Sequence, residues 1–424
     1  MKVIISAGGR GTRISSVVND IPKPMIKIGG KPVLEHELEN IREQGFTDVL
    51  ITIGHLGHVI RDYFGDGNKL GINIEYFEEK EPLGTAGALY YLKDKLTEDF
   101  LLLNGDSIMD INFNRMINFH KEHKADVTLL THPNSHPYDS ALIIADNNTH
   151  KVIQWMNKEE ERTVYKNRVN AGVHIISPKV LEGMHPGKTD LDREILKPLV
   201  STGNVYAYDS PEYIKDMGTP ERYRLVCDDF EKGKVQAKNL KNPQKAVFLD
   251  RDGTLNVYKG FITKYNDIEL IGGVVEAVKA INESGYLAIV VSNQPVIARG
   301  ECTFEELEEI NNKLETELGL KGAYIDDLFF CPHHPDKGFE GERPEYKVKC
   351  SCRKPEPGLL LKAAEKYNIE LSESYMVGDS VRDVQAGKRA GCKSVYIGDK
   401  DIEEACIRCE SLEEFVKIYI ERNN

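Results

Sequence analysis

Short apolar runs alternate with amphipathic stretches along the first half of the chain. The apolar runs have the length of buried strands and cover Lys2–Ser6, Asp48–Gly54, Ile72–Phe77, Phe100–Asn104 and Val127–Thr131. Apolar positions at helical spacing predict helices over Val33–Gln44, Leu56–Phe64, Thr85–Leu96 and Phe113–His123. This alternation predicts a mostly parallel sheet with helices on both faces. Strands dominate from Ser140 to Ser177, which indicates an antiparallel insert.

The same alternation resumes after a polar, basic segment, Lys232–Lys245, that Pro243 interrupts. Expected strands are Ala246–Asp250, Leu287–Ser292, Asp327–Phe330 and Tyr375–Val377, and expected helices are Gly273–Ser284, Phe304–Leu318 and Gly358–Tyr367. Because 424 residues are too many for one ordinary core, we expect two α/β domains. Their predicted bounds are 1–235 and 245–398, with a linker at 236–244 and a helical tail at 399–424.

Composition narrows the class of partner. The hydrophobic content of 40% and charged content of 29% are ordinary for a globular protein. A formal net charge of −13 argues against a nucleic-acid surface, which needs clustered Lys and Arg. The chain begins with a predicted strand and has no apolar run long enough to span a bilayer. We therefore expect a cytoplasmic location and small-molecule substrates, with no nucleic-acid or membrane partner and the oligomeric state open.

A glycine-rich turn follows the first expected strand and suits a nucleoside triphosphate. Its glycines let backbone N–H groups point at phosphate oxygens, as in an anion-binding nest. The expected nucleotide-binding residues are Gly8, Gly9, Gly11 and Thr12, with Arg13 and Lys23 as catalytic cations. The run Gly-Gly-Arg-Gly-Thr-Arg fits neither the dinucleotide fingerprint nor the P-loop pattern. By itself, such a turn is a weak signal.

Further runs resemble the sugar-1-phosphate nucleotidyltransferase family. They are residues 7–24, Glu81–Gly87, Asn104–Asp106, Asn170–Gly172 and Asp216–Thr219, in the family's order across residues 1 to 225. The resemblance implies a Rossmann-like, GT-A-like mixed sheet. It also implies that a sugar 1-phosphate attacks the α-phosphorus of a nucleoside triphosphate and releases pyrophosphate. Residues 82–89 look most like the guanylyltransferases of manno-configured sugars, which favours GTP.

This resemblance assigns roles to single residues. Asp106 and Asp216 are expected to hold Mg²⁺, since carboxylates with substrate phosphates are its usual ligands. The other implied contacts are Gly84 and Thr85 with the base, and Lys158, Asn170 and Asp192 with the sugar phosphate. The chain departs from the family at two of these positions. Asn-Lys-Glu stands at 157–159 where Glu-Lys-Pro is usual, and Asp192 stands where Glu is more common.

A second chemical motif opens the second half, where two carboxylates enter a glycine turn directly after a strand. Asp250 can attack phosphorus while Asp252 handles a proton. The pattern Asp-x-Asp-Gly-Thr resembles the haloacid-dehalogenase-type phosphatases. The family's later motifs match Ser292-Asn293, Lys354 and Gly378-Asp379.

The phosphatase resemblance implies a Rossmannoid fold and an aspartyl-phosphate on Asp250. It implies Mg²⁺ held by Asp250, Asp379 and the backbone carbonyl of Asp252. The implied substrate contacts are Thr254, Ser292, Asn293, Arg299, Arg353 and Lys354. Asp383 either supports the metal site or occupies the first turn of a helix, where negative charge is favourable.

Three cysteines and a histidine indicate a structural zinc site within the second half. Cys331, His333, Cys350 and Cys352 flank a charged loop and match a closed tetrahedral Zn²⁺ set at 331–352. Buried free thiols are the alternative. His333 is chosen over His334 because the resembling phosphatases use that position. Cys406 and Cys409 have redox spacing but follow no strand-to-helix turn, so they are not expected to bind metal.

The zinc loop narrows the phosphatase resemblance to the D-glycero-D-manno-heptose-1,7-bisphosphate phosphatases, with the histidinol phosphatases as rivals. Pro295-Val296 departs from the small Ser-Gly pair usual in both. Removing the 7-phosphate of heptose 1,7-bisphosphate yields heptose 1-phosphate, which a manno-selective guanylyltransferase would use. We therefore hypothesise a bifunctional enzyme that converts heptose 1,7-bisphosphate and GTP into GDP-heptose.

Three alternatives remain open from the sequence. The first is a mannose- or other hexose-1-phosphate nucleotidyltransferase fused to a histidinol-phosphatase-like enzyme. The second makes the first half a regulatory sugar-nucleotide-binding module, and the third makes the second half a scaffold. The complete sets of charged motif residues disfavour the last two, because neither a sensor nor a scaffold needs metal-binding carboxylates.

Overall fold

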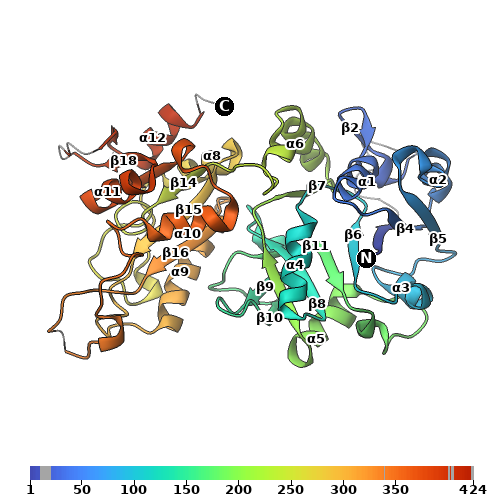
Figure 1. Cartoon of the computed structure of the whole chain (residues 1–424), viewed down its shortest axis with the longest axis horizontal. Coiled ribbons are helices and arrows are strands. Elements are labelled where there is room, and N and C mark those ends of the chain that lie inside the picture. Colours follow the sequence, from blue (N-terminus) through green and yellow to red (C-terminus); the bar gives the residue numbers. More distant parts are fainter. Residues whose placement is uncertain (10–20, 339, 400–401, 403–404, 422–424) are drawn as a thin grey trace. The chain divides into compact units, whose positions relative to one another are not determined.

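The computed structural model describes residues 1–9, 21–338, 340–399, 402 and 405–421 (Figure 1). The chain forms two compact units, each with its own core. The first contains residues 1–132, 143–156 and 170–239. The second contains residues 133–142, 157–169 and 240–424. Two short segments from the first half of the sequence therefore belong to the second unit.

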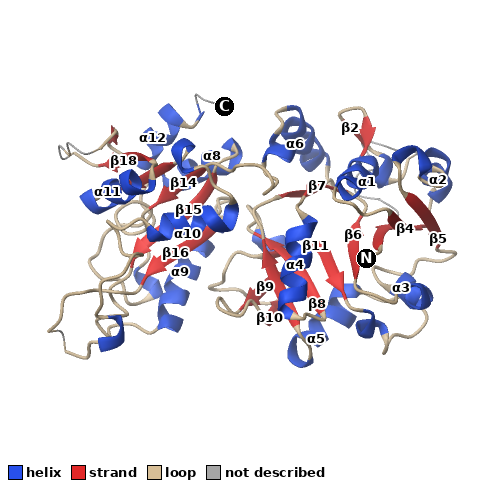
Figure 2. Ribbon diagram, in the orientation of Figure 1, coloured by secondary structure: helices blue, strands red, loops and turns tan. Residues whose placement is uncertain are grey.

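The first unit is built on a nine-stranded mixed sheet (Figure 2). Its strands are β1 (Val3–Ala7), β4 (Asp48–Ile53), β5 (Asn73–Glu78), β6 (Phe100–Asn104), β8 (Val127–His132), β9 (Leu142–Ala145), β10 (Val152–Met156), β11 (Val169–Ile176) and β12 (Val205–Asp209). Strands β6, β1, β4 and β5 are parallel neighbours, whereas β11 runs antiparallel to β6 and β9. The predicted mixed α/β sheet with an antiparallel insert is confirmed.

Helices cover this sheet because their apolar faces match its alternating buried positions. The helices of this unit are α1 (Val33–Glu43), α2 (Gly57–Phe64), α3 (Gly87–Leu92), α4 (Phe113–His123), α5 (Lys197–Thr202), α6 (Pro220–Glu231) and α7 (Lys234–Ala237). Helices α6 and α7 pack in a separate cluster with Ile108 and Tyr213. Leu34 and Leu38 of α1 and Met116 of α4 pack with Val3 and Ile51 of the sheet. Smaller ladders join β2 (Lys27–Ile28) to β3 (Lys31–Pro32), and β7 (Ser107–Asp110) to β13 (Tyr213–Asp216).

The second unit is a six-stranded parallel sheet in the order β16-β15-β14-β17-β18-β19. The strands are β14 (Ala246–Leu249), β15 (Leu287–Asn293), β16 (Asp327–Cys331), β17 (Tyr375–Gly378), β18 (Lys393–Ile397) and β19 (Ile407–Cys409). The helices are α8 (Val274–Ser284), α9 (Phe304–Gly319), α10 (Gly358–Tyr367), α11 (Val381–Ala390) and α12 (Leu412–Tyr419).

Alternate residues of β14 face two separate cores. Val247 and Leu249 pack with α8, α9 and α12, while Ala246 and Phe248 pack with α10 and Met376. A strand buried on both faces reads as a continuous apolar run, which is the pattern of Ala246–Leu249. The haloacid-dehalogenase-like fold predicted for the second half is confirmed.

The end of the chain differs from the helical tail predicted at 399–424. Strand β19 pairs in parallel with β18 and so extends the sheet. Helix α12 buries Leu412, Phe415 and Val416 in the core of the second unit. Three residues are too short for a periodicity argument, so the strand was missed and only the helix was expected. Among the described residues, no helix has both the length and the apolar character to cross a membrane.

Candidate active sites and metal centre

Three carboxylates meet at the carboxyl ends of two neighbouring parallel strands in the second unit. Asp250 directly follows β14, and Asp379 directly follows β17. Asp383 lies in the first turn of α11. One oxygen from each of the three lies within 4.8 Å of the others. Asp250 and Asp379 are thus brought together as the sequence predicted, with Asp383 beside them.

Lys354 is the cation that partly neutralises this group. Its side chain is only 2% exposed, and its Nζ lies 2.8 Å from Asp250 Oδ1 and 2.6 Å from Asp383 Oδ1. It also donates to the Val291 carbonyl at 2.8 Å. Burial and the nearby Asp383 raise the pKa of Asp250 to about 7, against the opposing effect of Lys354. Burial likewise raises the pKa of Asp379.

The donor set fits a divalent hard cation. Three acidic side chains face one lysine, and burial first, then the neighbouring negative charge of Asp383, raises the pKa values of Asp250 and Asp379. Oxygen ligands of this kind are those that Mg²⁺ takes together with substrate phosphate. Asp383 also caps α11, because Ser380 N and Oγ donate to its Oδ2 at 3.0 and 2.6 Å. Of the two roles that the sequence left open, the position in the first turn of the helix is therefore observed, while support of a metal site stays a prediction.

Asp252 is held in a cage of hydrogen-bond donors. Arg251, which is fully buried, bonds both carboxylate oxygens through Nη2 at 3.1 and 2.9 Å. Asn256 Nδ2 donates to Oδ1 at 3.0 Å and Gln294 Nε2 to Oδ2 at 2.9 Å. Burial raises the pKa of Asp252, but Arg251 and the two amide donors together bring it below its ordinary value. Asn311 of α9 accepts from Arg251 Nη1 at 2.8 Å and fixes the guanidinium.

The turn that follows Asp252 requires glycine. Gly253 has φ +89°, and a Cβ there would overlap Asp379 Oδ2. This close approach brings the loop after β14 against the carboxylate of Asp379, which follows β17. The glycine of the Asp-x-Asp-Gly-Thr motif therefore serves the assembly of the three-carboxylate group as well as the turn itself.

The remaining predicted substrate residues fall into two groups. Thr254 Oγ1 is buried and has no hydrogen-bond partner within the described part of the chain, and Ser292 Oγ accepts from Gln294 at 2.8 Å. Asn293 instead clamps the backbone of Lys354, through its amide nitrogen at 3.0 Å and its oxygen at 2.9 Å. Arg299 pairs with Glu301 at 2.7 Å and lies over the ring of Phe261.

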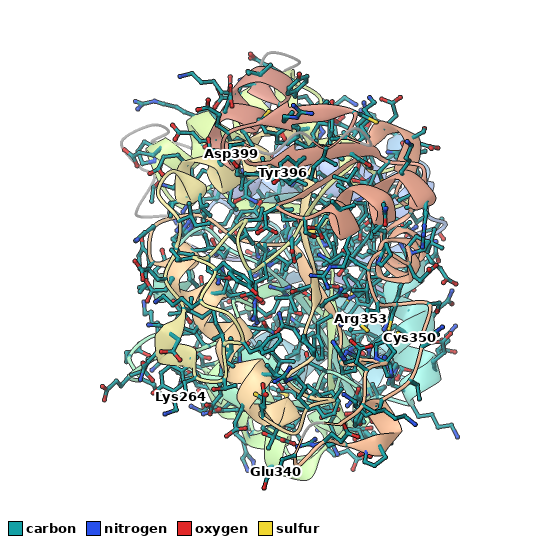
Figure 3. The ribbon with its side chains drawn as sticks, turned by 90° about the vertical axis from the view of Figure 1, so that its left-hand side faces the viewer. Lys264, Glu340, Cys350, Arg353, Tyr396 and Asp399 are labelled. Atoms are coloured by element: carbon teal, nitrogen blue, oxygen red, sulfur yellow. The ribbon has the colours of Figure 1, made fainter. Side chains whose placement is uncertain are left out.

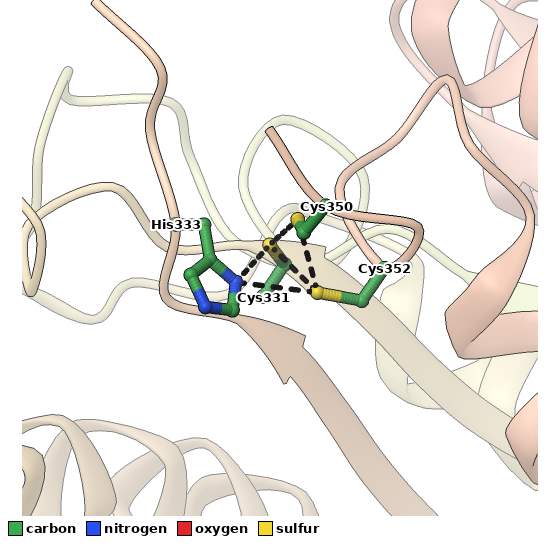
Figure 4. A group of neighbouring side chains, drawn as sticks. All are labelled: Cys331, His333, Cys350 and Cys352. Carbon is green, nitrogen blue, oxygen red and sulfur yellow. Dashed lines mark hydrogen bonds between the residues drawn. The ribbon is translucent and has the colours of Figure 1, made fainter. Parts of the chain in front are cut away.

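Three sulfurs and one ring nitrogen converge beyond the end of β16 (Figure 4). The Sγ atoms of Cys331, Cys350 and Cys352 are 3.2–3.5 Å apart. His333 Nδ1 lies 3.6 Å from Cys331 Sγ and 3.4 Å from Cys352 Sγ. A tetrahedral zinc with bonds of about 2.0–2.3 Å has ligand–ligand edges of about 3.5–3.8 Å, so the observed separations equal these edges or are a few tenths of an ångström shorter. His334 is not in this group.

The loop that carries the cysteine and histidine cluster leads directly to Lys354 of the carboxylate group. Arg353 and Cys350 lie close together in Figure 3, and Arg353 Nη1 donates to the His333 carbonyl at 2.9 Å. The next residue is Lys354, whose backbone Asn293 holds. The geometry therefore gives the cysteine and histidine cluster a mechanical task, which is to fix the segment that carries the buried lysine.

In the first unit, the predicted metal-binding aspartates come from neighbouring strand ends. Asp106 follows β6, and the ladder of β7 with β13 places Asp216 opposite Ser107. Lys23 Nζ lies 3.2 Å from Asp106 Oδ2. Asp216 accepts from Arg222 Nη1 at 2.7 Å. Two carboxylates that lie beside mobile cations fit a Mg²⁺ that arrives with a triphosphate, since the phosphates supply its other ligands.

The predicted base and sugar contacts meet in one segment of this unit. Gly84, with φ +78°, forms a bridge with Thr189, and Thr85 Oγ1 accepts from Leu191 N at 2.7 Å. Asp192 follows at once, and Asn170 Nδ2 donates to its Oδ1 at 3.3 Å. Gly84, Thr85, Asn170 and Asp192 are thus brought together.

Other predicted residues are placed separately or not at all. A Cβ on Gly8 would lie 2.9 Å from Glu79 Oε1, whereas Gly9 faces open space. Lys158 is exposed in a turn of the second unit. Gly11, Thr12 and Arg13 lie outside the described residues.

Sequence reasoning missed several buried polar residues near these groups. Arg251, Gln294 and Asn311 build the cage of Asp252, and His174 contacts Asn170. Glu37 of α1 is 1% exposed, and burial together with Asp106 raises its pKa. Arg251 stands between two motif aspartates, which was a usable signal. The others give none, because their partners are distant in sequence.

Comparisons with known proteins match the two halves of the chain to different families. Residues 2–233 match the nucleotidyl transferase family, and residues 201–391 match the haloacid dehalogenase-like hydrolase family. The "Probable mannose-1-phosphate guanylyltransferase 1" of Oryza sativa subsp. japonica is 32% identical over 247 residues, which are 56% of this chain and 68% of that protein.

The second half has relatives of its own. A D-glycero-beta-D-manno-heptose-1,7-bisphosphate 7-phosphatase of Yersinia pestis is 41% identical over 145 residues, which are 34% of this chain and 75% of that protein. Among solved structures, HddC from Yersinia pseudotuberculosis is 28% identical and matches 54% of this chain and 99% of its own, with a TM-score of 0.48.

Proposed function

We propose that the two activities of this chain are consecutive steps on one sugar. The chain belongs both to the nucleotidyl transferase family and to the haloacid dehalogenase-like hydrolases. The chain is a bifunctional enzyme with a nucleotidyltransferase half and a phosphatase half. The first step removes the 7-phosphate of D-glycero-D-manno-heptose 1,7-bisphosphate. The second transfers GMP from GTP to the resulting heptose 1-phosphate, giving GDP-heptose and pyrophosphate.

The phosphatase step follows from the arrangement around Asp250. An Asp250 oxygen attacks the 7-phosphorus and forms an aspartyl-phosphate, while the bond from phosphorus to the sugar oxygen breaks. Asp252, after taking up a proton from solvent, gives it to that oxygen, and it later takes one from the water that hydrolyses the intermediate. Lys354, beside Asp250, and Thr254, whose Oγ1 has no hydrogen-bond partner among the described residues, would bind the phosphoryl oxygens. Mg²⁺ at Asp250 and Asp379 would neutralise the charge of the phosphoryl group.

The nucleotidyl step joins two anions, so positioning and charge neutralisation are its main needs. An oxygen of the sugar phosphate attacks the α-phosphorus, and pyrophosphate leaves. Lys23, beside Asp106, is placed to meet triphosphate oxygens, and Arg13 would add a second cation. Asn170 and Asp192 would contact the sugar, and Gly84 and Thr85 would lie near the base. Asp106 and Asp216 would hold the Mg²⁺ that accompanies the nucleotide.

One observation carries the choice of sugar. The relatives of the second half are named for heptose 1,7-bisphosphate, and those of the first half for mannose 1-phosphate. Removal of the 7-phosphate from heptose 1,7-bisphosphate gives a manno-configured sugar 1-phosphate. Mannose-1-phosphate guanylyltransferases act on this class of substrate. A fusion of two such enzymes fits one substrate passing from the first reaction to the second.

Two further assignments concern a structural metal and the cellular location. We infer a structural zinc at Cys331, His333, Cys350 and Cys352, because the spacing of these ligands fits a tetrahedron. We also infer a cytoplasmic location, because none of the eight cysteines forms a disulfide in the part of the chain that the structure describes, as expected in reducing compartments.

The test supplies D-glycero-D-manno-heptose 1,7-bisphosphate, GTP and Mg²⁺ and measures orthophosphate, pyrophosphate and nucleotide sugar together. Both anomers are assayed, since the phosphatase relatives are named for the β form. We expect one orthophosphate and one pyrophosphate for each GDP-heptose formed. ATP in place of GTP, and histidinol phosphate or mannose 1-phosphate in place of the heptoses, should give lower kcat/KM. A higher value for histidinol phosphate would refute the substrate assignment.

Two variants separate the steps. Asp250→Asn should abolish orthophosphate release but leave nucleotidyl transfer from supplied heptose 1-phosphate unchanged. Asp106→Ala should do the reverse. A variant that silences both activities without loss of folding would contradict the assignment of two separate sites.

A further inference from the structure

The side-chain amide of Asn170 is held at both ends. Its Oδ1 accepts from Gly172 N at 3.2 Å and lies 3.1 Å from His174 Nε2. Its Nδ2 donates to Asp192 Oδ1 at 3.3 Å. A backbone N–H can only donate, so the atom of Asn170 that faces Gly172 and His174 must be the oxygen. His174 Nε2 must therefore carry a proton.

His174 is suited to be a permanent neutral donor. The residue is 2% exposed, and its Nδ1 is buried with no hydrogen-bond partner in the part of the chain that the structure describes. A second proton, on Nδ1, would place an unsatisfied charged N–H in the interior. Burial accordingly lowers the pKa of His174 to about 4. At neutral pH the imidazole has one N–H, and it points at Asn170.

The strand register places this pair beside the metal-binding end of β6. Strand β11 is antiparallel to β6, with His174 opposite Leu102. Gly172 has φ +75°, and a Cβ there would overlap Asn104 Nδ2. Asn104 begins the turn that carries Asp106. Asn170 therefore lies at the strand end where the nucleotide and sugar phosphates must meet.

We propose that His174 is a positioning residue for the sugar side of nucleotidyl transfer. It holds the Asn170 amide so that one N–H faces Asp192 and the other is free for a sugar hydroxyl. A carboxylate acceptor and an amide donor, fixed side by side, match two neighbouring hydroxyl groups of a pyranose. The inference rests on the proposed function, which assigns Asn170 and Asp192 to the sugar.

The charge on Asp192 gives this role a measurable signature. Burial and the nearby Asp190 raise the pKa of Asp192 to about 6, whereas the Asn170 hydrogen bond and Arg193 lower it. If Asn170 turns away, the ionised form of Asp192 loses a donor and its pKa rises further. The carboxylate then becomes protonated nearer neutral pH and no longer accepts two hydroxyl hydrogen bonds.

The experiment compares the full-length wild type with His174→Phe and His174→Leu, both of which lose the donor but fill the space. We expect KM for D-glycero-D-manno-heptose 1-phosphate to rise about tenfold, because a buried hydrogen bond is lost. The KM for GTP and kcat should change by less than about threefold. The acidic limb of kcat/KM for the sugar should move to higher pH. His174→Gln, which retains an N–H donor near the same position, should recover most of the loss.

Two controls separate positioning from simple packing. His120→Leu removes another buried histidine, 1% exposed and hydrogen-bonded to Thr128 at 2.8 Å, and should lower the melting temperature without changing the sugar KM. In an Asn170→Ala background, His174→Phe should have no further effect on the sugar KM, because the two residues act in series.

Several results would overturn the role of His174. They are additive effects in that double variant, equal increases in KM for both substrates, or no rescue by His174→Gln. A sugar KM equal to that of the wild type in the Phe or Leu variant would also overturn it. Wild-type protein that forms no nucleotide sugar from any heptose 1-phosphate would instead refute the proposed function itself.

Discussion

Arg251 sets the charge state of the group expected to move protons in the phosphatase. The guanidinium is fully buried and faces the Asp252 carboxylate, Asn311 and Gln294 at once. A carboxylate held this way stays ionised at lower pH than a free one. The cage therefore favours the form of Asp252 that accepts a proton from water, so the hydrolysis of the aspartyl-phosphate is the step that benefits most.

We predict that Arg251→Lys, which keeps the charge but loses the two-pronged geometry, lowers phosphatase kcat about 10- to 100-fold. The estimate follows from the usual contribution of a positioned acid–base group. Steady-state phosphate release at neutral pH measures the effect. Nucleotidyl transfer by the same preparation is the control, and an unchanged phosphatase kcat would contradict the role.

The burial of neutral His174 makes the first unit sensitive to acid. Its pKa of about 4 in the folded state lies below the ordinary value of about 6.5, so the unfolded chain binds the extra proton first. The stabilisation is complete above pH 6.5 and is lost as the pH falls toward 4. We predict that it contributes about 2 kcal/mol less at pH 5 than at pH 7.5.

Urea unfolding followed by Trp155, the single tryptophan and a buried residue of the first unit, measures this loss. His174→Gln has no titrating group at the site, so the free energies of unfolding of the two proteins should converge on acidification. Curves that stay parallel between pH 7.5 and 5 would show that His174 is not the group responsible.

Among the elements, strand ends matter more than strand interiors for function. Strands β14 and β17 are adjacent and parallel, so Asp250 and Asp379 meet although 129 positions separate them. The loop between β14 and the following segment can reach Asp379 only because Gly253 has no side chain. A turn that looks generic in the sequence is therefore a point of contact between two elements.

We predict that Gly253→Ala lowers phosphatase kcat/KM at least 100-fold, because a Cβ would displace the carboxylate of Asp379. Gly260→Ala is the matched control. Gly260 has a similar φ of +78°, but nothing lies within 4 Å of a Cβ there. It should cost about 1 kcal/mol in the free energy of unfolding and leave activity intact. Equal loss of activity in both variants would show that backbone strain alone lowers the activity of Gly253→Ala.

At the scale of the molecule, two compact units and two groups of carboxylates coexist in one chain. The three-carboxylate group, the cysteine and histidine cluster and Lys354 all belong to the second unit. Asp106 and Asp216 belong to the first. Magnesium should therefore be required by both activities, whereas a structural zinc should matter for the phosphatase alone.

We predict that the wild type contains one tightly held zinc and that Cys350→Ser loses it. Phosphatase activity should fall together with the melting temperature of the second unit, since structural zinc contributes folding free energy. Zinc content by elemental analysis and residual activity after heating measure the change. Cys406→Ser, at an exposed thiol outside the cluster, should behave as the wild type. Unchanged zinc in Cys350→Ser would exclude the proposed ligand set.

Much of the fold was predictable from the sequence because its signals are local. Strands such as Asp48–Ile53 and Leu287–Asn293 are continuous apolar runs, and helix α9 begins at a capping box formed by Thr303 and Glu306. Strand β19 was missed because it is short and has only one buried residue. Its pairing with β18 gives it structure, and no local pattern records that pairing.

The sequence by itself determined the residue types and spacings that reactions on phosphate esters need, and it marked Asp250, Asp252, Asp379 and the zinc cluster. These signals can be recognised in the sequence because each motif lies within a strand and the turn that follows it. Only the tertiary structure decided which buried groups orient them, such as Arg251 at Asp252 and His174 at Asn170. Hydrogen bonds between segments distant in the chain depend on how strands pair and helices pack, and that information becomes readable only once the chain has folded.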